Sequence, residues 1–240
     1  MAKYTLDQLA RMIDHTNLKA DALDADLEKL CEEAKKYHFA MVAINQIQSP
    51  ICAKFLADTD IKVGAAIAFP LGQTSIEAKV FETDNALNIG ASEIDYVLHI
   101  GKVREGDWDY IKREMTAVVD VCRKHGVISK VIFENCYLTD AQKIKLCEIA
   151  SDVKPDFIKT STGTAAGGAT LADVTLMRKY VSSDVQVKAS GGVRTADQFL
   201  AMLKCGVTRV GSSSGIAIIE EIKTRYFSNG EAYLEIECMN

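Results

Sequence analysis

Residues 156–192 read DFIKTSTGTAAGGATLADVTLMRKYVSSDVQVKASGG. Two short runs rich in apolar and β-branched residues, Asp156–Thr160 and Asp184–Ala189, flank a helix-like segment at Thr170–Tyr180. The helix-like segment begins with a threonine, a residue type that can cap the first turn of a helix. A strand, a helix and a second strand in this order predict two parallel strands joined by a right-handed crossover.

The same alternation extends in both directions along the chain. The other candidate strands are Arg11–Asp14, Phe39–Ile44, Lys62–Phe69, Glu93–His99, Ser129–Glu134 and Thr208–Gly211. Further helix-like segments are Thr74–Asn88, Trp108–Lys124, Thr139–Ala150 and Thr195–Lys204. Eight strands in 240 residues fit a closed barrel better than an open doubly wound sheet. We therefore predict one α/β domain over residues 1–240, a (β/α)8 TIM barrel with a short N-terminal helix. Residues 227–240 would form a mobile tail or an interface strand.

Composition narrows the possible partners. The net charge is −5, and lysine and arginine are spread along the chain, so nothing favours nucleic acid as a partner. The seven cysteines include no C-x-x-C pair, which indicates reduced thiols. The most apolar run, Val63–Leu71, is too short to span a bilayer and contains Pro70, and residues 1–11 lack a signal-peptide pattern. We expect a cytoplasmic protein with no membrane partner.

Charged residues recur at the C-terminal ends of the predicted strands. Asp14 ends the first strand, Asp95 lies in the fourth, and Lys130 lies in the fifth. Lys159 and Lys188 follow on the sixth and seventh. A single charge at a strand end is best interpreted as exposed to water. Recurrence on successive strands instead predicts a site, because barrel enzymes build their active sites at this face.

The two lysines on neighbouring strands suggest a specific chemistry. At one depth in the barrel, Lys159 and Lys188 would bring two ammonium groups together. Like charge and desolvation both lower the pKa of a lysine. A neutral lysine amine is the nucleophile that forms an imine with a carbonyl substrate. We therefore predict Lys159 as a Schiff-base residue.

Glycine and serine follow the last two strands. Gly191-Gly192 comes after the seventh strand, and Gly211-Ser212-Ser213-Ser214-Gly215 comes after the eighth and opens a helix near Ile216. Glycines allow close approach of the backbone, serines add donors, and a helix N-terminus favours an anion. Barrel enzymes commonly hold phosphate in these loops. The pattern predicts a phosphate site.

Taken together, these segments resemble the deoxyribose-phosphate aldolase family of class I aldolases over nearly the whole chain. The segments that carry the resemblance are Ile13-Asp14-His15-Thr16, Phe69-Pro70-Leu71-Gly72, Glu93-Ile94-Asp95, Lys130-Val131-Ile132 with Glu134, Lys159-Thr160-Ser161-Thr162-Gly163, Lys188-Ala189-Ser190-Gly191-Gly192 and the serine-rich run 211–215. The resemblance implies reversible cleavage of 2-deoxy-D-ribose 5-phosphate into D-glyceraldehyde 3-phosphate and acetaldehyde. It also implies a role in deoxyribonucleoside catabolism, no metal or organic cofactor, and a homo-oligomer, either dimer or tetramer.

The resemblance assigns a role to each matching residue. Lys159 would form the Schiff base, Lys188 would lower its pKa and take part in proton transfer, and Asp95 would be the proton donor and acceptor, working through a water. Asp14 and Lys130 would complete the polar network. The phosphate would be held by Gly163, Gly191, Gly192, Gly211, Ser213 and Ser214.

Some positions depart from the family pattern. Ala43 stands where relatives often carry a cysteine, Thr164 where a larger or basic residue is usual, and Ala20 where a proline is usual. Thr164 would lie near the phosphate and affect substrate preference. Two alternatives stay open: a Schiff-base aldolase for another phosphosugar or a non-phosphorylated aldehyde, and a phosphosugar-binding barrel without catalysis.

Other polar residues are given structural interpretations. His15 adjoins Asp14 without a third group for a nucleophilic triad, so we expect a structural hydrogen bond. Trp108 heads a helix and should pack. No metal site is predicted, because the remaining histidines lack carboxylate or cysteine partners at ligand spacing: His38, His99 and His125. A solvated helix face is predicted for Glu77, Lys79 and Glu82.

Overall fold

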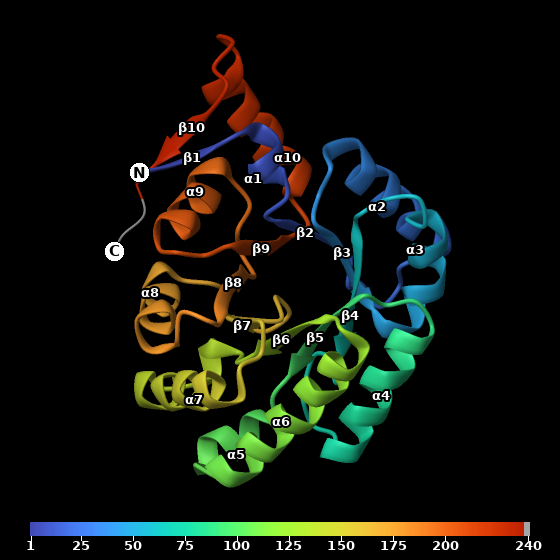
Figure 1. Cartoon of the computed structure of the whole chain (residues 1–240), viewed down its shortest axis with the longest axis vertical. Helices are drawn as coiled ribbons and strands as arrows, with labels where there is room; N and C mark the ends of the chain where they lie inside the picture. The colour runs from blue at the N-terminus through green and yellow to red at the C-terminus, as the bar shows by residue number, and fades with distance from the viewer. Residues whose placement is uncertain (238–240) are drawn as a thin grey trace.

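The computed structural model describes residues 1–237, and its centre is a closed barrel of eight parallel strands (Figure 1). Each strand pairs with the next along the chain, and the last closes against the first. The predicted (β/α)8 barrel is confirmed. The strands are β2 (Ile13–Thr16), β3 (Met41–Asn45), β4 (Lys62–Ile67), β5 (Glu93–Val97), β6 (Ile128–Ile132), β7 (Phe157–Lys159), β8 (Gln186–Ser190) and β9 (Arg209–Ser212).

Helices surround the barrel as an outer ring (Figure 1). They are α1 (Leu6–Ala10), α2 (Asp24–Tyr37), α3 (Ser49–Phe55), α4 (Ile76–Asn88), α5 (Ile100–Glu105), α6 (Trp108–His125), α7 (Asp140–Val153), α8 (Leu171–Tyr180), α9 (Ala196–Lys204) and α10 (Gly215–Ile222), with short helical turns η1 (Gln46–Gln48), η2 (Asn135–Tyr137) and η3 (Lys223–Phe227). Helix α6 illustrates how capping residues determine where these helices begin and end. The Asp107 side chain accepts a hydrogen bond from the Tyr110 N–H at 3.2 Å, and Gly126 ends the helix with a φ of 67°.

The barrel has an apolar exterior and a charged interior. Successive strand residues face opposite sides, so β5 turns Glu93 and Asp95 inward and Ile94 outward. Outward-facing residues such as Ile94 and Val131 pack under the helices and are fully buried. The apolar layer between strands and helices therefore stabilises the fold, which leaves the barrel interior free to hold polar groups.

The chain ends form a second, small sheet. Strand β1 (Ala2–Tyr4) pairs antiparallel with β10 (Leu234–Ile236), and the two lie beside α9 and α10 (Figure 1). Part of the segment proposed as a tail or interface strand is thus paired within the chain, and residues 238–240 lie outside the described residues. Within residues 1–237, no helix combines the length and the apolarity needed to cross a bilayer.

The first barrel strand begins two residues later than predicted. Arg11 is the C-cap of α1, with φ −65° and ψ −1°, and so belongs to the end of the helix. The predicted N-terminal helix is present, and its capping box is formed by Thr5 and Gln8. Strand β2 then begins at Ile13.

The prediction of a solvated face on α4 is wrong for Lys79. Glu77 is exposed, but the Lys79 side chain is fully buried. Its ammonium forms a very short ion pair with the buried Glu114 of α6 and donates to the Val97 carbonyl at 2.7 Å. Glu82 is half-buried and accepts a hydrogen bond from the Ala68 N–H at 2.9 Å. The partner on α6 is distant in sequence, so helical spacing within α4 could not reveal it.

Candidate active site

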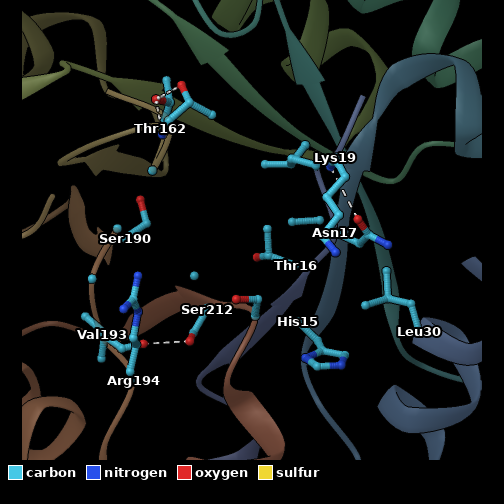
Figure 2. Close-up of a pocket in the computed structure, with 18 of the residues that line it drawn as sticks. His15, Thr16, Asn17, Lys19, Leu30, Thr162, Ser190, Val193, Arg194 and Ser212 are labelled. Atoms are coloured by element: carbon cyan, nitrogen blue, oxygen red, sulfur yellow. Dashed lines mark hydrogen bonds between the residues drawn. The ribbon is translucent and has the colours of Figure 1, made fainter. Parts of the chain in front are cut away.

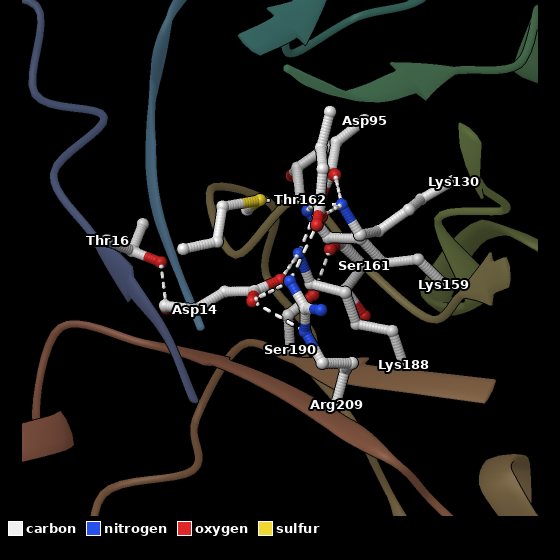
Figure 3. A network of polar contacts seen from close by, with 12 residues as sticks. Asp14, Thr16, Asp95, Lys130, Lys159, Ser161, Thr162, Lys188, Ser190 and Arg209 are labelled. Atoms are coloured by element: carbon white, nitrogen blue, oxygen red, sulfur yellow. Dashed lines mark hydrogen bonds and ion pairs between the residues drawn. The ribbon is translucent and has the colours of Figure 1, made fainter. Parts of the chain in front are cut away.

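Six charged side chains form a closed ring inside the barrel. Figure 3 labels Asp14, Asp95, Lys130, Lys188 and Arg209 of this ring. Each cation bridges two carboxylates, and each carboxylate bridges two cations. The contacts, in order around the ring, are Asp14–Lys188 (2.5 Å), Lys188–Asp95 (2.6 Å), Asp95–Lys130 (2.8 Å), Lys130–Glu93 (2.5 Å), Glu93–Arg209 (3.0 Å) and Arg209–Asp14 (2.6 Å). With three carboxylates and three cations, the ring is electrically balanced. Paired and hydrogen-bonded charges of this kind can tolerate burial.

Lys159 is the seventh charged side chain and has no carboxylate of its own. It is in register with Lys188 on the neighbouring strand, so the two lysines are at one depth, as predicted. Its Nζ contacts Asp95 Oδ2 at 2.8 Å, an oxygen that Lys188 already occupies. Burial, aided by the charges of Lys188 and Lys130, lowers the pKa of Lys159 to about 8, although Asp95 opposes the shift. Lys159 is therefore a lysine beside the ring that readily becomes a neutral amine.

Asp95 lies at the junction between the ring and Lys159. Burial alone would raise its pKa, but the charges of Lys130, Lys159 and Lys188 hold that pKa well below its usual range. The Asp95 carboxylate is therefore ionised at neutral pH and places a negative charge beside Lys159. A cation that forms on Lys159 would be stabilised at once by this carboxylate.

Lys159 lines a cavity of about 570 Å³. Figure 2 shows side chains of the cavity wall. Among the described residues, Lys159 is the one member of this charged group that lines the cavity. The cavity wall also contains five of the six residues predicted to hold phosphate, namely Gly163, Gly191, Gly192, Gly211 and Ser213. Ser214 is not part of the wall. It is the N-cap of α10, and its N–H donates to Ser212 Oγ at 3.0 Å.

The glycine loops approach each other too closely for side chains. A Cβ on Gly191 would lie 3.0 Å from the Cα of Gly168 and 3.3 Å from the Cα of Gly163. Gly191 also has a φ of 84°, which glycine adopts most easily. The loop after β7 is fixed further by Glu134, whose carboxylate accepts from the N–H of Thr162 at 3.1 Å. A side chain at position 191 would therefore force these loops apart.

Several residues of the site were given no role from the sequence. Glu93 and Arg209 complete the charged ring, and Arg194 and Lys19 line the cavity beside Thr164. Glu93 could have been predicted, because it lies two residues before Asp95 on the same strand. Side chains two residues apart on a strand face the same side of the sheet. Arg209 begins β9, at the end of the strand far from the predicted active face, so no local pattern marked it.

The remaining polar predictions have mixed outcomes. His15 Nε2 contacts Glu33 at 2.8 Å, which is the predicted kind of hydrogen bond. Trp108 packs against the hydrophobic core, as predicted. Six cysteines are free thiols, and Cys238 lies outside the described residues. Ala43 lines the cavity.

The chain matches a family model described as DeoC/LacD family aldolase over residues 8–222. It is 58% identical to a deoxyribose-phosphate aldolase of Lactobacillus acidophilus, over 93% of this chain and 94% of that protein. A relative of the same name from Bacteroides thetaiotaomicron is 48% identical over the same shares. The tetrameric deoxyribose phosphate aldolase from Aeropyrum pernix superimposes with a TM-score of 0.85 at 28% identity, covering 92% of this chain and 93% of that one. The chain belongs to the DeoC/LacD aldolase family.

Proposed function

We propose that this protein is a deoxyribose-phosphate aldolase. It would cleave 2-deoxy-D-ribose 5-phosphate reversibly into D-glyceraldehyde 3-phosphate and acetaldehyde, in the catabolism of deoxyribonucleosides. The observation that carries the proposal is Lys159, a buried lysine with a lowered pKa that lines the cavity above a charge-balanced ring. The identity of 58% to a relative of that name supports the choice of substrate.

The reaction would begin at the amine of Lys159. The neutral Nζ attacks the aldehyde carbon of the open-chain sugar, and loss of water gives a protonated imine. Removal of the proton from the C3 hydroxyl then breaks the C2–C3 bond, whose electrons move into the imine to form an enamine. Glyceraldehyde 3-phosphate leaves, the enamine is protonated at C2, and hydrolysis releases acetaldehyde and the free lysine. No step needs a metal or an organic cofactor.

Asp95 and Lys188 would manage charge and protons during these steps. The carboxylate of Asp95 contacts both lysines, so it can stabilise the protonated imine and accept a proton through a water. A positioned acid or base of this kind typically accelerates proton transfer by about 10²–10⁴-fold. Asp14 and Lys130 would hold Lys188 and Asp95 in place through the ring.

The phosphate would bind at the glycine-rich side of the cavity. Gly163, Gly191, Gly192, Gly211 and Ser213 would supply backbone and hydroxyl donors, while Ser214 would orient the N-terminus of α10. Arg194 and Lys19 line the same cavity and add positive charge that Thr164 does not provide. The charges would favour a phosphorylated substrate over the free sugar.

The test is a coupled assay for glyceraldehyde 3-phosphate release from deoxyribose 5-phosphate. Fructose phosphates and free deoxyribose serve as competing substrates. A preference for a fructose phosphate would indicate a Schiff-base aldolase of another specificity. Binding of phosphosugar without turnover of any of them would indicate a binding protein.

Borohydride reduction in the presence of acetaldehyde provides a direct test of the nucleophile. We expect one ethyl group to be fixed on Lys159 with loss of activity. Peptide mapping that found the label on Lys188 or on a surface lysine would overturn the assignment.

We further propose that the protein is a cytoplasmic homo-oligomer, a dimer or a tetramer, with no nucleic-acid partner. The tetrameric relative from Aeropyrum pernix and the even spread of charge along this chain support this proposal. Light scattering after size-exclusion chromatography would give the mass of the assembly, and a monomer would contradict the proposal.

A further inference from the structure

His15 of β2 lies next to the serine-rich run 211–215 and lines the cavity. Strand alternation turns Asp14 inward and His15 outward, into the layer between strands and helices. The His15 side chain is 4% exposed, and its ring is 5.0 Å from that of Phe39. Its Nε2 contacts Glu33 of α2 at 2.8 Å. His15 is also in register with Ser212 of β9. One side chain thus touches α2 and the strand end that carries the turn.

The geometry defines which nitrogen carries the proton. Burial lowers the pKa of His15, so the ring is neutral at neutral pH. The Glu33 carboxylate can only accept, so Nε2 is the donor in this contact. Nδ1 is buried beside the backbone of Ser212. A Cβ on Gly215 would lie only 3.2 Å from it. The first residue of α10 therefore rests directly on the imidazole.

The segment 212–215, which packs against His15, connects two loops of the cavity wall. Ser212 Oγ donates to the Val193 carbonyl at 2.7 Å and accepts from the Ser214 N–H at 3.0 Å. A shift of Ser212 would therefore move both the turn after β9 and the loop after β8. Figure 2 shows His15, Ser212 and Val193 along the same side of the cavity.

We propose that His15, oriented by Glu33, is a positioning residue for the phosphate end of the cavity. It sets the geometry of residues 212–215 and so acts on phosphate recognition, not on the reaction at Lys159. The inference rests on the proposed function in one respect, that the substrate phosphate binds beside this turn. His15 and Glu33 also line the cavity, and His15 would act on the turn through its contacts with Ser212 and Gly215.

The experiment compares a phosphate readout with a phosphate-free one in the same variants. The first readout is the dissociation constant of inorganic phosphate, followed by thermal shift, together with the KM for deoxyribose 5-phosphate. The second is the rate of borohydride trapping of Lys159 with acetaldehyde, which carries no phosphate. For His15→Ala we expect phosphate affinity to fall roughly tenfold, the loss of about one good polar contact, while trapping stays within about twofold.

Three further variants make the result specific. His15→Gln keeps a donor for Glu33 and should recover part of the phosphate affinity. Glu33→Gln keeps the acceptor and should stay near wild type. His38→Asn removes a histidine–carboxylate contact elsewhere in the molecule and should leave both readouts unchanged.

Two outcomes would overturn the proposal. One is an equal loss of trapping and of phosphate binding in His15→Ala, which would indicate a general structural defect. The other is unchanged phosphate affinity in that variant, or no phosphate binding by the wild type. If the wild type failed to cleave deoxyribose 5-phosphate, the proposed function would fall, while phosphate binding and trapping would still test His15.

Discussion

Two lysines of this protein are buried in very different surroundings. Lys159 at the end of β7 is 4% exposed, and Lys79 on α4 is fully buried. Burial lowers the pKa of both. Lys79, however, has a carboxylate to itself, because Glu114 pairs with no other cation among the described residues. Lys159 shares Asp95 with Lys130 and Lys188 and faces a cavity.

The difference shows that burial by itself does not make a lysine reactive. In a one-to-one buried pair the carboxylate opposes loss of the lysine proton, as Glu114 does for Lys79, and both side chains of this pair are fully buried. A surplus cation beside a balanced ring can lose its proton without leaving a carboxylate of the ring unpaired. The cavity gives this lysine access to a substrate. Access and surplus charge therefore distinguish the site.

Lys159→Arg should give the largest effect on activity. Guanidinium stays protonated and cannot form an imine, so turnover should fall by roughly 10⁴-fold or more. The imine should no longer be trapped by borohydride. Lys159→Leu, which removes the surplus cation, should be equally inactive but fold normally by circular dichroism. Measurable turnover in either variant would show that another residue is the nucleophile.

Lys79→Met should give the largest effect on stability. It leaves Glu114 buried without its partner, a change that typically costs about 3–5 kcal/mol. Urea unfolding measures this loss, and trapping at Lys159 in the folded fraction should be unaffected. Adding Glu114→Leu should restore part of the stability, since no buried charge then remains. Full restoration is not expected, because the Val97 carbonyl and the His99 N–H lose their partners. A stable single mutant would contradict this account of the pair.

The comparison of Lys159 with Lys79 also shows which features of the structure could be predicted from the sequence. The barrel and the lysine pair were predictable, because strand alternation and charges at strand ends are local patterns. The error at Lys79 has a clear origin: the partner Glu114 lies on another helix. The signal that was available is on α6, where Glu114 occupies the buried face between Ile111 and Val118. A carboxylate at such a position requires a buried cation.

Local sequence patterns could not predict the complete ring for a related reason. Arg209 reaches Asp14 across a sequence separation of 195 residues, a contact that exists only once the barrel closes. The same holds for His15 and Glu33, which lie on different elements. Spacing within one element predicts which face a side chain takes, whereas its partner is decided by the fold.

Lys188→Leu tests the surplus-charge argument directly. In the wild type, activity should rise with pH through about 8, as Lys159 loses its proton. Removing the Lys188 charge leaves the ring with more carboxylates than cations, so the pKa of Lys159 should rise. Activity should then fall roughly tenfold more at pH 7 than at pH 9. The measurement is kcat/KM against pH. An unchanged rise in that profile would show that Lys188 does not tune Lys159.

His38→Asn tests the opposite limit, a charge cluster at the surface, and should give the smallest effect. Sequence spacing indicates no carboxylate partner for His38, yet Asp7 lies 2.6 Å and Asp60 3.1 Å from its ring. The hydrogen bond to Asp7 raises the pKa of His38, although partial desolvation opposes it. A raised pKa means that the contribution to stability is fully present below the unfolded-state pKa, near 6.5, and is lost as pH rises through the folded-state pKa.

The His38 side chain is 46% exposed, so solvent screening should keep this contribution below about 1 kcal/mol. Asparagine tolerates the left-handed backbone at this position, where φ is 55°, which avoids a separate strain effect. We therefore expect the free energies of unfolding of wild type and variant to differ slightly at pH 5.5 and to converge by pH 8.5. A difference as large as that for Lys79→Met, or one that grew with pH, would show that burial does not separate the two kinds of charge cluster.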